Sequence, residues 1–129
     1  GSHIALLAEA GIGPDQRIVV DRLVAVVDCG RAINPGLVRQ QVEGSLLQAL
    51  ALATGDKPRF VAGMPVARRS GQAGFATTPQ IEVEISPSRA DPGGISGLGH
   101  VVLAAAVANA IAAGTGRRLR ALPFDSMAD

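Results

Sequence analysis

The chain has 129 residues, a formal net charge of +1 and 47% hydrophobic residues, enough for one modest folded core. Aromatic residues make up only 2%, and Trp and Tyr are absent, which argues against stacking platforms for nucleic acid. Twelve basic and eleven acidic residues leave too little net charge for a surface that binds DNA or an anionic membrane. The single Cys29 excludes an internal disulfide. The sequence has no cluster of Cys and His residues that would indicate a zinc site.

The chain is read as one domain with short ends. Residues 1–3, Gly-Ser-His, are typical of a purification-tag remnant, and residues 125–129 are assigned to a tail. Residues 4–124 form the predicted domain, with 56–78 as an irregular loop and a short strand considered at 59–62. The longest apolar run, residues 101–113, is shorter than the ~20 residues of a membrane span, so no membrane insertion is expected.

Two strand-like runs open the domain. Residues 4–12 and 17–28 are apolar, and the Gly and Pro residues between them predict a β-hairpin with a loop of about three to five residues. From Leu23 onward the second run is apolar on both faces. This pattern is typical of a central strand that is covered on both sides.

A helix is predicted from Asn34 to about Thr54. Asn34 is a favourable N-cap, Pro35 suits the first helical position, and Gly55 ends the periodic pattern. The predicted buried stripe consists of Val38, Val42, Leu46, Ala49 and Ala53. A polar stripe beside it consists of Gln41, Ser45 and Gln48. The residues alone leave open whether this stripe is a solvated face or a functional surface.

A third strand and a second helix complete the fold. Residues 80–85 alternate between apolar residues and the exposed carboxylates of Glu82 and Glu84, which favours a solvated strand face over a catalytic carboxylate pair. The helix at about 100–113 is apolar on all sides, so it is predicted to be buried, with Asn109 needing a hydrogen-bond partner. The fold class is therefore α+β, in the order β-β-α-β-α, with a small mixed sheet of three to four strands covered by two helices.

Few side chains suggest chemistry on their own. The loop 92–99, PGGISGLG, precedes a helix N-terminus and can be either a tight turn or an anion site, whereas its spacing disfavours a dinucleotide fingerprint. Cys29 is a buried inert thiol or, alternatively, faces a ligand. Asp28 either caps the turn at Gly30 or pairs with Arg31. His100 has no nucleophile or second base nearby, so no triad, P-loop or metal site can be assembled.

Several blocks together resemble a known family. VDCGRAINPGLVRQQVEG, PQIEVEISPS, PGG and ANAIAAGTGRRLRALPF are similar to the C-terminal part of molybdenum hydroxylase large subunits. The branch they resemble most is the isoquinoline 1-oxidoreductase beta-subunit type, related to xanthine dehydrogenase and aldehyde oxidase. The resemblance covers residues 4–124, and 56–78 is its loosest part.

The resemblance implies an oxidoreductase that hydroxylates N-heterocycles or aldehydes with a molybdopterin cofactor, in its cytosine dinucleotide form in bacteria. In the family's Q-x-E-G block the Gln lies near the pterin, which maps onto Gln41, and Gly44 allows close approach. The resemblance also implies cofactor contacts at Gly94, Ser96 and Gly97. The family's catalytic glutamate falls at position 97, where this chain has glycine and therefore no proton acceptor.

The family's subunits are several times longer than this chain. The resemblance therefore implies a fragment or truncated paralogue that supplies one wall of the site, with the rest of the large subunit and an iron–sulfur subunit as partners. Alone, the chain is expected to be colourless, inactive and free of cofactor, and able to form a homodimer. A cytoplasmic or periplasmic bacterial location remains open. The alternatives are a non-catalytic assembly domain of the same family and a small anion-binding module at residues 93–100.

Overall fold

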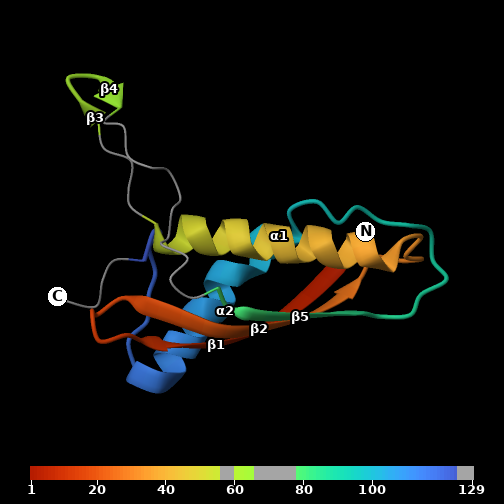
Figure 1. Cartoon of the computed structure of the whole chain (residues 1–129), viewed down its shortest axis with the longest axis horizontal. Helices are drawn as coiled ribbons and strands as arrows, with labels where there is room; N and C mark the ends of the chain where they lie inside the picture. The colour runs from red at the N-terminus through yellow and green to blue at the C-terminus, as the bar shows by residue number, and fades with distance from the viewer. Residues whose placement is uncertain (56–59, 66–77, 125–129) are drawn as a thin grey trace.

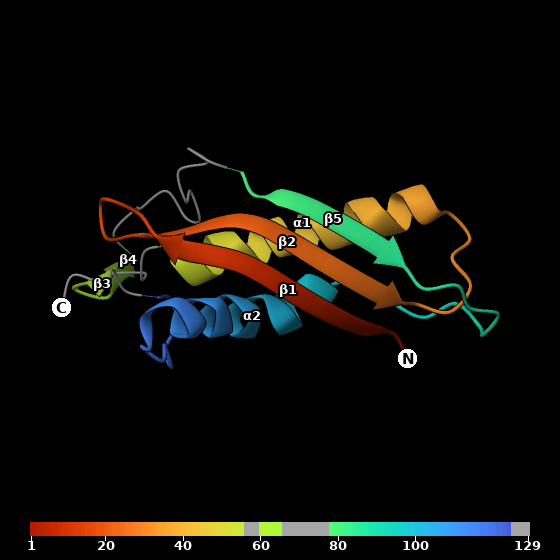
Figure 2. The ribbon, with the colours of Figure 1, turned by 90° about the horizontal axis from the view of Figure 1, so that it is seen from below.

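The computed structural model describes residues 1–55, 60–65 and 78–124. The elements follow in the order β1 (His3–Ile12), β2 (Ile18–Asp28), α1 (Pro35–Thr54), β3 (Phe60–Val61), β4 (Met64–Pro65), β5 (Gln80–Ile85) and α2 (Leu98–Thr115). Strands β1, β2 and β5 form one sheet, and both helices lie against one face of it, which gives two layers (Figures 1 and 2). The predicted α+β class is confirmed.

The sheet is mixed, with β2 at its centre. Strands β1 and β2 pair antiparallel and are joined by the predicted hairpin loop, residues 13–17. His3 pairs with Asp28, so the strand begins inside the segment assigned to a tag remnant. Strands β2 and β5 pair parallel, from Arg22 opposite Gln80 to Val27 opposite Ile85. The carboxyl ends of β2 and β5 therefore lie side by side, and the loops that follow them share one edge of the sheet.

A second, two-stranded sheet lies within the range predicted as an irregular loop. Phe60 pairs with Pro65 and Val61 with Met64, so the short strand considered at 59–62 is present as β3. The rest of that range, residues 56–59 and 66–77, lies outside the described residues, as does the predicted tail at 125–129.

Helix α1 begins and packs as its sequence predicts. Asn34 is extended, with φ of −130°, and its Oδ1 accepts a hydrogen bond of 3.1 Å from the backbone N–H of Leu37. This bond satisfies one of the unpaired donors of the first turn, and Pro35 has no N–H to satisfy. The buried side chains are the predicted stripe with one addition, Ser45.

The core lies between the inner face of the sheet and the two helices. Leu23, Ala25 and Val27 of β2 are fully buried on that face. The opposite face is exposed among the described residues, because Val26 keeps 43% and Leu7 57% of its surface accessible. The expectation that β2 is covered on both sides is therefore wrong. Both helices lie on one face of the sheet. The polar side chains of the other face come mainly from the strands beside β2, so the sequence of β2 alone does not show that this face is exposed.

Helix α2 is buried on one face only, which corrects the prediction that it is buried all round. Its buried residues are Gly99, Leu103, Val107 and Ile111. Val101 is 76% exposed. Asn109 is also exposed, and its Oδ1 accepts a hydrogen bond of 2.9 Å from Nη1 of Arg118. The helix is long and apolar enough to span a membrane, with 18 residues and a mean hydropathy of 1.6, and its buried face packs against β1 and α1.

Candidate functional site

Two loops meet at the carboxyl ends of β2 and β5, the edge where open α/β sheets bind ligands. In the loop after β2, the Cys29 carbonyl accepts a hydrogen bond of 2.8 Å from the N–H of Gly93, which lies in the loop after β5. The N–H of Arg31, in the same loop, donates a hydrogen bond of 2.9 Å to the Ala90 carbonyl. These two backbone hydrogen bonds fix the position of one loop relative to the other.

Gly30 makes this close approach possible. Its φ of +68° is a left-handed conformation that favours glycine, and a Cβ there would collide with the Asp91 carbonyl. Of the two alternatives for Asp28, the structure has the turn cap, because its Oδ1 accepts a hydrogen bond of 3.0 Å from the N–H of Gly30. Cys29 beside it is 3% exposed, which agrees with the interpretation of a buried thiol.

A second junction joins α1 to the start of α2. The buried Oγ of Ser45 accepts a hydrogen bond of 3.0 Å from the N–H of Gly99 and donates one of 2.9 Å to the Val42 carbonyl. Gly97, the N-cap residue of α2, provides no side-chain cap, so Ser45 satisfies a first-turn donor from the neighbouring helix. A Cβ at Gly99 would stand 2.6 Å from the backbone nitrogen of Leu46. Only glycine lets the two helices meet this closely.

The junction brings the Q-x-E-G block next to the glycine-rich loop. Gln41 precedes Ser45 by one turn, so it lies on the flank of α1 that faces the start of α2. Gln41 and Gly44 are exposed, as are Gly94 and Ser96 in the loop. A Cβ added at Gly44, Gly94 or Gly97 would meet no atom within 4 Å. Gln41 and Gly44 thus lie within about one turn of Ser45, which contacts the start of α2, and no direct contact joins Gln41 to the loop. Of the polar stripe, Gln41 and Gln48 are exposed, whereas Ser45 is structural.

Position 97 has a distinctive backbone. Gly97 has φ of +74°, in the left-handed region, and its carbonyl accepts a hydrogen bond of 3.0 Å from the N–H of His100. A non-glycine residue in that conformation costs about 1–2 kcal/mol, although the space around the position is free. The backbone therefore favours the glycine that the sequence carries.

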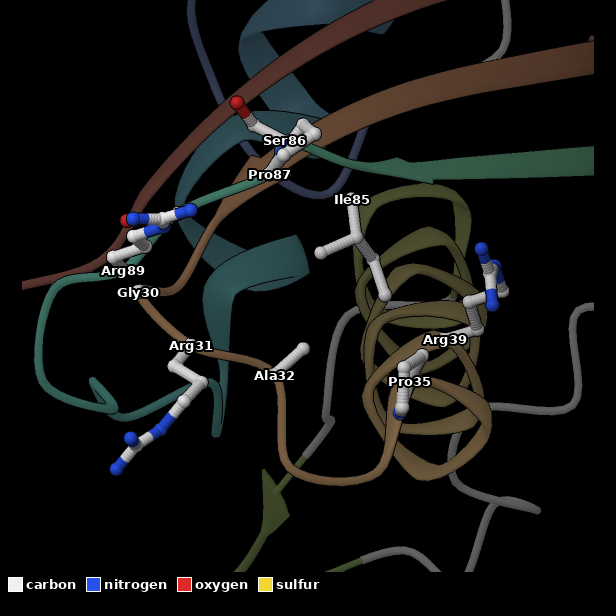
Figure 3. A pocket seen from close by; sticks show the side chains of 10 residues that line it. Gly30, Arg31, Ala32, Pro35, Arg39, Ile85, Ser86, Pro87 and Arg89 are labelled. Atoms are coloured by element: carbon white, nitrogen blue, oxygen red, sulfur yellow. The ribbon is translucent and has the colours of Figure 1, made fainter.

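Sequence reasoning missed a cleft of about 580 Å³ beside these loops (Figure 3). Its lining residues are Gly30, Arg31, Ala32, Pro35, Arg39, Ile85, Ser86, Pro87, Ser88 and Arg89. Three of them are arginines and none is acidic. The arginines come from two loops and a helix that are distant in the sequence. They meet through the parallel pairing of β2 with β5 and the packing of α1 against β5, so no single segment of the sequence indicates the cleft.

The exposed face of the sheet carries the clearest ion pairs. Nη2 of Arg22 lies 2.9 Å from Oε1 of Glu82, and its Nη1 lies 3.3 Å from Oε1 of Glu9. The hydrogen bond and charge of Glu82, followed by Glu9, raise the pKa of Arg22 above its usual value. Glu82 and Glu84 are both exposed, so the solvated-face interpretation holds. Among the described residues, no three His, Cys, Asp or Glu side chains gather as a metal site.

Comparison with known proteins identifies the family. Residues 14–81, more than half of the chain, match the sequence profile of the molybdopterin cofactor-binding domain. The chain belongs to this family, and the prediction that it is part of a molybdenum hydroxylase large subunit is confirmed.

Three relatives illustrate the match. A membrane-bound aldehyde dehydrogenase [pyrroloquinoline-quinone] of Gluconacetobacter polyoxogenes is 32% identical over 82% of this chain and 14% of its own length. Isoquinoline 1-oxidoreductase subunit beta of Brevundimonas diminuta is 29% identical over 95% of this chain and 16% of its own length. The crystal structure of quinoline 2-oxidoreductase from Pseudomonas putida 86 superposes with a TM-score of 0.62, at 26% identity over 85% of this chain and 16% of that one. The chain thus spans 14–16% of the length of these proteins.

Proposed function

We propose that this domain supplies one wall of the molybdopterin site in a molybdenum hydroxylase. The Ser45–Gly99 hydrogen bond carries the proposal, because it joins the helix bearing Gln41 and Gly44 to the loop bearing Gly94, Ser96 and Gly97. These two segments are the ones that the family resemblance associates with the cofactor. The described residues fit a pterin, because the surface offers polar side chains and backbone groups next to glycines that leave room for a planar ring.

Each residue has a distinct role in this wall. The side-chain amide of Gln41 is both a hydrogen-bond donor and an acceptor, which suits the edge of a pterin. Gly44, Gly94 and Gly97 permit close approach of the backbone, and the Ser96 hydroxyl adds a polar contact. When bound, the cofactor supplies the redox and oxygen-transfer chemistry, and the protein's part is to bind and orient it.

The same proposal extends to the rest of the assembly. The cofactor is the cytosine dinucleotide form, the other walls of the site come from the remainder of the large subunit, and electrons leave through an iron–sulfur subunit. N-heterocycles or aldehydes are the proposed substrates. The names of the isoquinoline, quinoline and aldehyde-oxidising relatives support this range.

A second candidate is a non-catalytic assembly domain of the same family. Gly97 favours it, because glycine replaces the expected glutamate in a left-handed conformation that suits glycine. Loss of a positioned general base lowers the rate of a reaction about 10²–10⁴-fold. This candidate therefore predicts a native protein that holds the cofactor but hydroxylates very slowly.

Substitution of Gln41 tests the proposed wall in the native protein that carries this chain. We expect Gln41→Ala to weaken pterin retention about two- to tenfold, which corresponds to the loss of one hydrogen bond. The readout is the ratio of pterin to protein after extended dialysis, which does not depend on turnover. Gln40→Ala is the matched control, because Gln40 is an adjacent, exposed glutamine that points in another direction on α1. Equal retention in both variants would remove Gln41 from the site.

A further inference from the structure

The arginine cleft described above is lined by three arginines and by no carboxylate. The side chains of Arg31 and Arg89 form no hydrogen bond or ion pair within the described part of the chain. Arg39 is exposed, and its Nε donates a hydrogen bond of 3.3 Å to the Val83 carbonyl. Helix α1 also begins at the cleft with no acidic residue in its first turn, so its positive end adds to the field.

The shape of the cleft favours an extended ligand over a single small anion. Its apolar lining residues, called the floor, are Ala32, Pro35, Ile85 and Pro87. Figure 3 shows Arg31 and Arg39 on different sides of this floor, and the three guanidinium groups do not point at one common spot. A lone phosphate would engage one arginine at most, whereas a ligand with several separated anionic groups can reach more than one.

The cleft and the Ser45–Gly99 junction lie on different flanks of α1. Arg39 reaches β5 on one flank of α1, whereas Ser45 meets the start of α2 on another. A ligand in the cleft would therefore lie across α1 from Gln41.

We propose that the cleft docks an acidic polypeptide segment of another protein chain. Carboxylates of the segment pair with Arg31 and Arg89, and one of its apolar side chains packs on the floor between Ala32 and Ile85. Charge complementarity supports this occupant, because the lining holds three arginines and no carboxylate. An acidic segment also supplies the spaced anionic groups and the apolar surface that the cleft accommodates. The inference stands apart from cofactor binding.

Titration of the isotope-labelled chain with capped hexaglutamate tests the proposal by NMR. At low ionic strength we expect the amide shifts to centre on residues 30–32 and 86–89, and to fade as salt screens the charges. The double variant Arg31→Glu/Arg89→Glu should weaken binding about tenfold or more, because attraction becomes repulsion. Both side chains are exposed, so circular dichroism should show an unchanged fold.

The matched control is Arg17→Glu/Arg120→Glu, which changes the net charge equally at exposed arginines outside the cleft. It should retain the affinity of the unsubstituted chain. Equal weakening in both double variants would mean attraction to net charge alone and would overturn the proposal. Inorganic phosphate that produces the same shifts with the same affinity would indicate a small-anion site instead. An absence of shifts at 30–32 and 86–89 would also contradict the proposal.

Discussion

Ser45 and Gly99 together hold the proposed cofactor surface in place. The serine hydroxyl replaces the missing cap of α2, and the glycine lets the backbone of α2 approach that of α1. Neither residue faces the proposed ligand, since both are buried. Their effect on the site is therefore indirect, through the position of the loop that carries Gly94, Ser96 and Gly97.

Gly99→Ala tests this contact. The added methyl would stand 2.6 Å from the backbone nitrogen of Leu46, so the two helices would have to move apart. We expect the free energy of unfolding to fall by about 1–3 kcal/mol, measured by urea denaturation. The control is Gly114→Ala near the end of the same helix, where a Cβ meets no atom within 4 Å. That change should stabilise the chain by up to about 1 kcal/mol. Equal effects in the two variants would contradict the close contact.

At the level of elements, the two helices differ in how well the sequence predicts them. Val38, Val42 and Leu46 repeat at helical spacing among polar residues, so the buried stripe of α1 was predictable. Helix α2 is rich in alanine on every side, so its pattern does not show which face packs, and its exposed face was predicted wrongly. Only the tertiary contacts with β1 and α1 distinguish its buried face.

A pair of valine substitutions tests the one-sided burial of α2. Val107 is fully buried, and we expect Val107→Ala to lower the free energy of unfolding by about 1.5–3 kcal/mol. Val101 is 76% exposed, and Val101→Ala should change it by no more than about 0.5 kcal/mol. Both changes remove the same atoms from the same helix, so helix propensity is matched. Similar losses in the two variants would mean that α2 is covered on both faces.

At the level of the whole molecule, the order of elements and the mixed sheet could be predicted from the sequence, because strand alternation and helix caps are local signals. The surfaces could not, because they depend on which distant segments meet. The arginine cleft needs the parallel pairing of β2 with β5, and the Ser45–Gly99 contact needs the packing of α1 on α2. Gln41 was chosen from family resemblance, and its role as a cofactor contact stays a prediction.

The exposed face of the sheet is another surface that could not be predicted from the sequence. It combines Leu7 and Val26 with the ion pairs of Arg22. The chain spans a small part of each relative's length, so a face that is open in this domain can be an internal surface of a longer protein. For this reason the central claim must be tested in the native protein that carries the chain.

The most direct measurement is the molybdenum and pterin content of that native protein, purified without added cofactor. Metal analysis should find molybdenum, and the fluorescence of the released pterin should match it in amount. This is the result expected if the surface around Gln41 and Gly97 is one wall of a molybdopterin site. A properly folded native protein that contains neither molybdenum nor pterin would contradict the account.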